Sequence, residues 1–484
     1  MRQTVIKQLR LDCNPIGRVE LNIESRDEMV PILAALQYLY GQQDLRALVM
    51  DMVAQDVNVD TRDDVGREGF SYWEIVVLSS VRLGCNLDYD KLQDLAENHR
   101  ALRSVMGIGD WDQSTSFSYR RIRDNICLLQ PTTLEKINQC IVAHGQQLAG
   151  DAREVVRADS FVIETNIHFP TESGLIWDGI RKIIPLCVSL AEHVSAPGWR
   201  QATQLRKRIK QQARVISQIS SSKSPKAKDA LPGAYRELLE RTATVIRRAK
   251  ELLEIADEGV ELLLKAKELQ GWIELTEQVC DTARRRVLLG ESVPNTEKLF
   301  SLFETHTQLY RRGKAGTPNQ FGRAVLLFED QVGFISHYHL MQRDVQDADV
   351  IVEQTRRVQE LHEGEIKRAS FDRGFFTAEN EKELLQIVES PCLPPRHPKQ
   401  FAEKMKDASV EFRQSRQRHP GIESAIGALQ AGNGLKRCRD RSELGMERYI
   451  ALAILGRNLQ TLGKLIIADK NAKCEAARSK RKAA

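Results

Sequence analysis

The chain has 484 residues, of which 42% are hydrophobic and 28% are charged, and its formal net charge is +5. This length and apolar content suffice for roughly two to four domains with sizeable cores. The apolar runs are too short to span a bilayer, and the N-terminus lacks the apolar stretch of a signal peptide. Nine cysteines without a Cys-x-x-Cys pair argue against a structural zinc site and fit reduced thiols. We therefore expect a soluble cytoplasmic protein.

The first part of the chain, residues 1–145, is predicted to be an N-terminal helical DNA-binding region. Apolar residues recur at helical spacing from Asp27 to about Ala143. Within this block, residues 89–97 and 100–106 favour two short helices, and a glycine pair then breaks the chain. A third helix follows, so the order helix, turn, helix is similar to that of DNA-reading modules.

The start of that third helix is predicted from its candidate N-cap residues, which are Asp112, Ser114 and Thr115. Three basic residues lie on it and would face DNA: Arg120, Arg121 and Arg123. The alternative interpretation, of about equal weight, is a solvated helix that carries arginines for solubility.

The middle of the chain changes character twice. Residues 150–173 are enriched in β-branched and aromatic side chains, which predicts a pair of strands around Asp159. Residues 174–295 are predicted to form a helical block, because residues 237–290 are rich in Leu, Glu, Lys, Arg and Ala, which is typical of long antiparallel helices. Strands and helices alternate over 300–465, and residues 466–484 form a basic tail that we expect to be mobile.

Three acidic residues far apart in the sequence occupy positions where a regular element would hold them rigidly. Asp159 and Asp372 each end a strand-like run, and Glu423 lies on a helix with one apolar face. Such carboxylates suit a metal-dependent phosphoryl-transfer site, in which two Mg²⁺ or Mn²⁺ ions stabilise the attacking and leaving oxygens. We expect Asp159 to bridge the ions. Glu164 and Asp178 are rivals for its role, and any single acid is most often a surface residue.

Without the helical block, the order is strand with Asp, strands, helix, strand with Asp, strand, and helix with Glu. This order predicts an α/β RNase H-like catalytic core with a mixed sheet. The core would comprise residues 150–173 and 300–465, and residues 174–295 would be a long helical insertion. The all-α region over 1–145 would precede it.

Two further basic groups lie close to these elements in the sequence. The first group lies at the start of a glycine-rich loop between two strands, and we expect it to contact a DNA backbone: Arg311, Arg312 and Lys314. The second precedes Glu423 and would meet phosphates near the scissile bond: Arg416, Arg418 and His419. A plain turn and a solvated basic helix end are the respective alternatives.

The chain resembles bacterial insertion-sequence transposases of the DDE class, specifically the ISNCY-type group, over most of residues 20–465. The matching phrases are Ala158-Asp-Ser160, Glu164-Thr-Asn-Ile-His-Phe-Pro-Thr-Glu-Ser173, Lys314-Ala-Gly-Thr-Pro-Asn-Gln-Phe-Gly-Arg323, Asp372-Arg-Gly-Phe375 and Arg418-His-Pro-Gly-Ile-Glu-Ser-Ala-Ile426, followed by Gly434-Leu-Lys-Arg-Cys-Arg-Asp440. Related transposases often carry a lysine seven positions after the catalytic glutamate. That position is Gln430 here, so a lysine contact to the element end is not carried over.

The resemblance implies an RNase H-like core that binds divalent metal through Asp159, Asp372 and Glu423. It also implies recognition of terminal inverted repeats by the N-terminal helices. The expected function is cleavage of element ends and joining of the 3′-OH to target DNA. The expected partners are double-stranded DNA and a second copy of the chain, in a bacterial cytoplasm and at the nucleoid when bound. The alternatives are a catalytically inactive transposase-derived DNA-binding protein and a metal-dependent nuclease without strand transfer.

Overall fold

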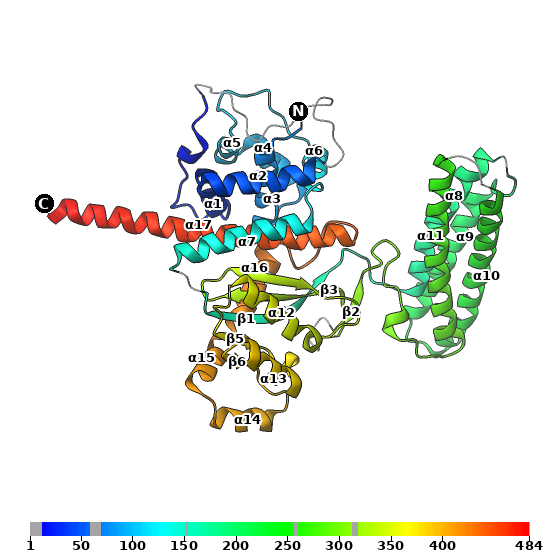
Figure 1. Ribbon diagram of the computed structural model, residues 1–484. Helices are drawn as coiled ribbons and strands as arrows, with labels where there is room; N and C mark the ends of the chain where they lie inside the picture. The colour runs from blue at the N-terminus through cyan, green and yellow to red at the C-terminus, as the bar shows by residue number, and fades with distance from the viewer. Residues whose placement is uncertain are drawn as a thin grey trace. The chain divides into compact units, whose positions relative to one another are not determined.

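The computed structural model describes residues 12–58, 69–150, 153–194, 196–255, 260–311 and 318–483. It divides into two compact units, one formed by Met1–Glu164 with Ala324–Ala484 and the other by Thr165–Arg323. The fold is mostly helical, with one mixed sheet of six strands in the described part of the chain (Figure 1). Each unit has its own hydrophobic core.

The N-terminal helices were predicted correctly as a group, and they pack in the same unit as most of the sheet. Their bounds are η1 Ile16–Arg18, α1 Met29–Gly41, α2 Gln43–Val57, α3 Tyr72–Gly84, α4 Tyr89–Asn98, α5 Arg100–Met106, α6 Tyr119–Ile126 and α7 Pro131–Leu148. Helix α3 begins with a capping box formed by Ser71 and Glu74, and α5 ends at Gly107 in the left-handed conformation.

The predicted start of α6 was wrong. The N-cap of this helix is Ser118, whose hydroxyl accepts a hydrogen bond from the backbone N–H of Arg121. The Asp112 carboxylate instead accepts hydrogen bonds from the backbone N–H groups of Ser114 and Thr115 and closes a turn before the helix. These bonds favour the charged form, so the pKa of Asp112 is well below its usual range despite the opposing effect of desolvation. Aspartate serves N-caps and turns by the same hydrogen bond, so the sequence does not separate the two.

The sheet has the strand order β2-β3-β1-β5-β6, with β4 paired to β3. The strands are β1 Val155–Glu164, β2 Gln308–Tyr310, β3 Gln320–Asp330, β4 Ile335–Leu340, β5 Arg368–Phe371 and β6 Ser390–Cys392. Strand β5 runs parallel to both β1 and β6, whereas β3 is antiparallel to β2 and β4. The prediction of two strands around Asp159 was wrong, because β1 is one strand of ten residues with Asp159 in its middle.

Helices on both sides cover the part of the sheet in the first unit. Their bounds are α12 Asp347–Leu361, η4 Arg373–Phe375, α13 Ala378–Ile387, α14 Pro398–Lys406, α15 Val410–Arg418, α16 Gly421–Gly432 and α17 Glu443–Ala483. Helix α16 packs against β1, α15 packs against β5 and β6, and α12 packs against β4 and η4. The first unit therefore has a layer of strands with helices on either face.

Helix α17 is the central helix of the first unit and contacts α1, α3 and α7 (Figure 1). It continues through the basic segment that was predicted to be a mobile tail, and that segment is helical to Ala483. Over Glu443–Ala477 it is long and apolar enough to cross a membrane, by length and composition alone. However, 67% of its most apolar stretch is buried inside the protein, which is the pattern of a soluble protein's core helix.

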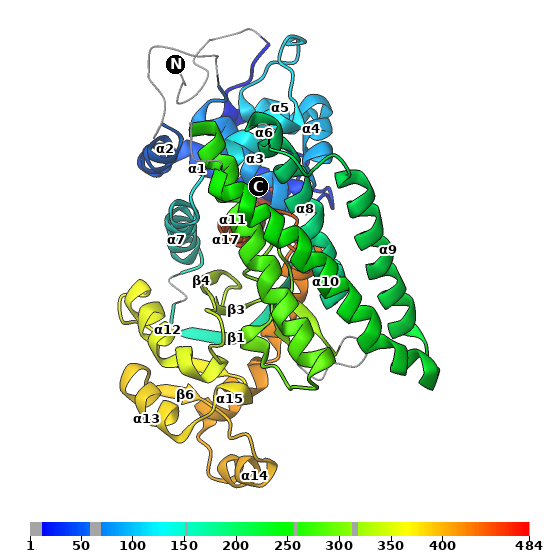
Figure 2. The same cartoon turned by 90° about the vertical axis from the view of Figure 1, so that its right-hand side faces the viewer.

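The second unit is mainly a bundle of four long helices in its described residues, and Figure 2 shows them side by side. The helices are α8 Glu172–His193, α9 Ala202–Ser221, α10 Pro225–Ile255 and α11 Val260–Ala283, followed by η2 Arg284–Leu288 and η3 Asn295–Glu297. Helix α8 contacts each of the other three. Apolar side chains such as Ile180, Leu238 and Ile273 fill the bundle core and are fully buried.

Candidate functional site

Asp159 and Asp372 lie next to one another across two parallel strands. The register of β1 and β5 pairs Arg157 with Ser370 and Ala158 with Phe371. The next position on each strand is Asp159 on β1 and Asp372 directly after β5. Neighbouring strands are about 4.8 Å apart. Two residues separated by more than two hundred positions in the sequence are therefore brought together at the end of β5.

Both carboxylates extend from the same face of the sheet. Side chains alternate between faces along a strand, so Asp159 shares a face with Arg157, and Asp372 shares one with Ser370. Asp372 keeps an extended backbone, with φ −80° and ψ 165°, so the alternation holds there. The Arg157 Nη1 donates to the carbonyl of Arg418 at 3.1 Å. The shared face is thus the one that the end of α15 covers.

The junction of α15 and α16 is fixed to this face by buried contacts. The Nδ1 of His419 lies 3.2 Å from the Ser370 hydroxyl. A Cβ atom at Gly421 would lie 2.1 Å from the Arg157 Nη1, so a side chain at this position would displace the guanidinium. Arg157 also donates from Nε to the Glu329 carboxylate at 2.5 Å. A β-bulge between Phe328 and Glu329 interrupts the β3–β4 ladder at that position.

Glu423 lies in the first turn of α16, two residues after the contact with Arg157. Its side chain is exposed, whereas Ile422 and Ala425 on the same helix are buried in the core. Among the described residues, no group of three or more His, Cys, Asp or Glu side chains is close enough to hold a metal ion. The structure therefore brings Asp159 and Asp372 together but does not assemble all three predicted ligands around one point.

The chemistry of the Asp159–Asp372 pair fits a hard divalent cation. Asp372 is exposed and Asp159 is half-buried, so water reaches the site. Mg²⁺ prefers oxygen ligands and keeps several waters, and it is commonly bound through one or two carboxylates. The pair therefore suits such an ion, and a two-ion site needs at least one further carboxylate nearby.

Asp347 is a neighbouring carboxylate that the sequence did not single out. Its Oδ2 accepts a hydrogen bond of 2.8 Å from the hydroxyl of Ser160, the residue after Asp159. The same oxygen would lie 3.9 Å from a Cβ atom at Gly374, two residues after Asp372. Ser160 projects from the other face of β1, so Asp347 approaches the pair from the α12 side. An acid in the first turn of a helix usually complements the helix dipole, so the position of Asp347 in the sequence carries no functional signal.

The two rivals of Asp159 are each engaged elsewhere. Glu164 is the last residue of β1, and its carboxylate accepts a hydrogen bond from the Arg437 guanidinium at 2.9 Å. Asp178 belongs to α8 in the second unit, where Arg181 lies 3.0 Å away. Burial raises the pKa of Asp178, although His168 and Arg181 oppose this effect. Neither rival adjoins Asp372 on the sheet.

His419 was predicted to contact DNA, but the residue is only 5% exposed. Burial lowers the pKa of His419 to about 4, and nearby Arg416 acts in the same direction while Asp372 opposes it. The ring is therefore neutral at physiological pH. Its position against Ser370 makes it part of the packing that holds the α15–α16 junction on the sheet.

The other predicted DNA-binding residues are spread over both units. All three arginines of α6 are exposed. Arg123 forms an ion pair with Asp124 at 2.8 Å, and Arg120 donates a hydrogen bond to the Tyr119 hydroxyl. The guanidinium of Arg121 lies 4.4 Å from the centre of the Phe70 ring. Arg418 is exposed and Arg416 is half-buried, so the α15 end does present a cation. Arg311 is exposed in the second unit, and Arg312 and Lys314 lie outside the described residues.

Comparisons of the chain with protein-family models, with curated proteins and with solved structures found no match.

Proposed function

We propose that the protein is a DNA transposase of the DDE type with an RNase H-like core. The observation that carries this proposal is the register of β1 and β5, which places Asp159 beside Asp372 on one face of the sheet. A carboxylate within β1 beside one directly after the parallel strand β5 provides a rigid, water-accessible site for phosphoryl transfer. The sequence resemblance to insertion-sequence transposases supports the same function, and the cytoplasm is the compartment that we propose.

The proposed reaction has two steps. A water oxygen attacks the phosphorus at the element end, the bond from phosphorus to the 3′ oxygen breaks, and a 3′-OH and a 5′-phosphate are left. The 3′ oxygen then attacks a phosphorus of the target DNA, whose own 3′ oxygen leaves with a proton. The two ends must be held together for joining, so we propose self-association on DNA.

The side chains of the pair would hold Mg²⁺ or Mn²⁺. Two such ions would supply charge stabilisation for the attacking and leaving oxygens. Asp159 would supply its carboxylate oxygens to the ions, and one of these oxygens also accepts a hydrogen bond of 2.7 Å from the backbone N–H of Ser160. Glu423 and Asp347 are the candidates for the third carboxylate. Glu423 is favoured by the resemblance, and Asp347 by its contact with Ser160.

A second candidate function is an inactive, transposase-derived DNA-binding protein. Among the described residues no three-ligand group surrounds the pair, which is compatible with this candidate as well as with the first. This candidate keeps the fold and the DNA-binding surfaces but predicts no metal-dependent cleavage.

The experiment is Mg²⁺-dependent nicking of a duplex that carries the sequence flanking the gene. The variants are Asp372→Asn, Glu423→Gln and Asp347→Asn. The control is Glu154→Gln, an exposed carboxylate just before β1 whose partner is Lys367. We expect cleavage by wild type and control and none by Asp372→Asn. Whichever of the other two variants is inactive identifies the third carboxylate.

Binding without cleavage by the wild type would replace the first candidate with the inactive DNA-binding protein. Normal cleavage by Asp372→Asn would refute the carboxylate pair as the site. A strand-transfer assay with precut ends then separates a transposase from a nuclease that cuts without joining.

A further inference from the structure

One segment of the second unit carries an unusual concentration of positive charge. Residues 194–228 contain nine Lys and Arg residues and no Asp or Glu. Because the whole chain has a formal net charge of +5 and this segment contributes +9, all other residues together contribute −4. The positive charge of the protein therefore resides in this segment, most of which is α9.

The basic side chains of α9 lie on its exposed side. Ile209, Ala213 and Ile216 are buried and face the bundle. Five cations of this helix are exposed: Arg206, Lys207, Arg208, Lys210 and Arg214. At 100° per residue, Lys207, Lys210 and Arg214 fall within about 60° of one another, on a side of the helix that excludes the buried residues. They form a continuous stripe, which we call the α9 basic stripe.

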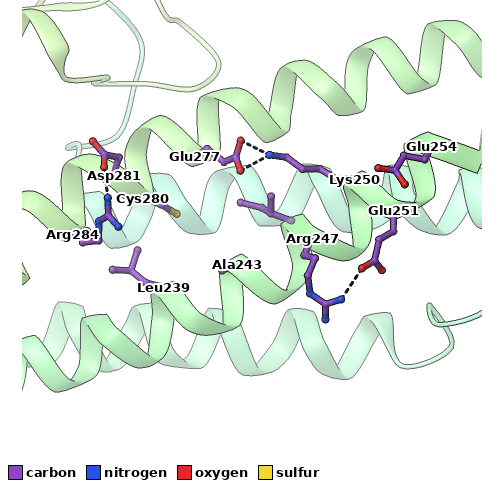
Figure 3. A pocket seen from close by; sticks show the side chains of 11 residues that line it. Leu239, Ala243, Arg247, Lys250, Glu251, Glu254, Glu277, Cys280, Asp281 and Arg284 are labelled. Carbon is purple, nitrogen blue, oxygen red and sulfur yellow. Dashed lines mark hydrogen bonds and ion pairs between the residues drawn. The ribbon is translucent and has the colours of Figure 1, made fainter.

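Three cations of α10 are paired with carboxylates, whereas among the described residues the cations of the α9 basic stripe are not. On α10, Arg241 pairs with Glu237 at 2.6 Å and Arg247 pairs with Glu251 at 2.7 Å. Lys250 reaches across to Glu277 on α11 at 2.7 Å, and Figure 3 shows this pair together with that of Arg247.

In the described part of the chain, no carboxylate forms an ion pair with a cation of the α9 basic stripe. The nearest recorded partner is the Trp177 ring, whose centre lies 5.6 Å from the Nζ of Lys210. A stripe of exposed cations without carboxylate partners creates a positive local potential that attracts an external polyanion.

We propose that the α9 basic stripe is a contact surface for the sugar–phosphate backbone of double-stranded DNA. A helix of this length spans about 30 Å, and duplex DNA carries one charge per about 1.7 Å of its axis, so several phosphates lie within reach. A membrane surface fits less well, because an interfacial helix exposes large apolar side chains, and among the described residues of α9 none is exposed. The identification of the polyanion as DNA rests on the proposed function. The charge pattern itself is independent of that function.

The test compares two variants of the full-length protein that lose equal charge. The first removes the α9 basic stripe by the substitutions Lys207→Gln, Lys210→Gln and Arg214→Gln. The control removes three paired cations of α10 by Arg241→Gln, Arg247→Gln and Lys250→Gln. Binding to a labelled duplex of arbitrary sequence is measured by fluorescence anisotropy between about 50 and 200 mM salt.

We expect the α9 variant to bind more weakly and to lower the slope of log K against log salt by about 2 to 3, since each lost phosphate contact removes about 0.9. The control should keep the wild-type slope. A charge-conserving variant, with Lys207→Arg, Lys210→Arg and Arg214→Lys, should also retain it.

Equal slopes for the α9 variant and the α10 control would overturn this inference and leave the proposed function standing. A wild-type protein that fails to bind any duplex would overturn both. Cleavage by the Asp159–Asp372 pair is measured separately, so the two failures are distinguishable.

Discussion

The contact of Arg157 with Glu329 provides a quantitative test of how the candidate site is held together. The Glu329 side chain is only 4% exposed, whereas that of Arg157 is 26% exposed. Arg157→Met would leave the Glu329 carboxylate buried without a cation, and breaking a buried pair in this way costs about 3–5 kcal/mol. Because Arg157 is partly exposed, we expect a value near the lower limit, about 3 kcal/mol.

The double variant Arg157→Met with Glu329→Gln should cost much less than the single one, because no uncompensated charge remains. We expect a coupling energy of about 2 kcal/mol from the double-mutant cycle. The control is Arg437→Met, which breaks the more exposed pair with Glu164 on the same strand and should cost at most about 1 kcal/mol.

The assay for this prediction must report on β1 rather than on the whole chain. The two units have separate cores, so a single free energy of unfolding is not well defined. Hydrogen exchange of the amides in Val155–Glu164 gives the local value. A loss of about 3 kcal/mol corresponds to a roughly hundredfold lower protection factor. Equal protection in Arg157→Met and Arg437→Met would refute the reasoning.

Three further predictions concern the first unit. Burial lowers the pKa of three histidines to about 4, which are His337, His362 and His419. In the unfolded chain these histidines take up protons near pH 6.5, whereas in the folded protein they stay neutral until about pH 4. The folded state therefore has its full stability above pH 6.5 and loses up to about 3 kcal/mol per histidine as the pH falls toward 4. Burial raises the pKa of Asp330 to about 6, so this residue changes the stability in the opposite direction. A melting temperature that does not fall between pH 6.5 and 4 would contradict the prediction for the histidines. Asp440→Asn should destabilise by about 3–5 kcal/mol in urea titrations of the first unit, because it leaves the fully buried Arg82 without its carboxylate. Gly456→Ala should cost about 1–3 kcal/mol, since its Cβ would lie 2.6 Å from the Gly84 nitrogen, whereas Gly427→Ala on α16 meets nothing and should be neutral or stabilising.

The sequence predicted the helical regions and the alternation of strands and helices over 300–465, because their periodicity is local. It misplaced the start of α6 and the strand break at Asp159 for physical reasons. The polar pair Asp159–Ser160 interrupts an apolar run and therefore looked like the break between two strands, but both residues lie inside β1. The charged segment after residue 465 was predicted to be a mobile tail; its Ala, Lys and Glu residues are strong helix formers and continue α17, and its mobility stays a prediction.

Only part of the candidate site could be predicted from the sequence. The position of Asp372 after a strand could be predicted, but the register that places Asp159 beside it depends on pairing between distant segments. Burial of His419 could not be foreseen either, because a basic run gives no sign of which member faces the sheet. Asp347 was missed because its contact with Ser160 is made through the tertiary fold alone.

The two proposed activities lie in different units, and this makes them separable. The second unit begins directly after β1 and ends within β3, so it is inserted between strands that neighbour each other in the sheet. The pairing of β1 with β5, which forms the carboxylate pair, involves no residue of that unit. Loss of the α9 basic stripe should therefore weaken DNA binding without changing the rate of cleavage at saturating DNA, whereas Asp372→Asn should abolish cleavage without changing the salt dependence of binding. A variant of the α9 basic stripe that cleaves slowly even at saturation would show that the second unit also positions the scissile phosphate.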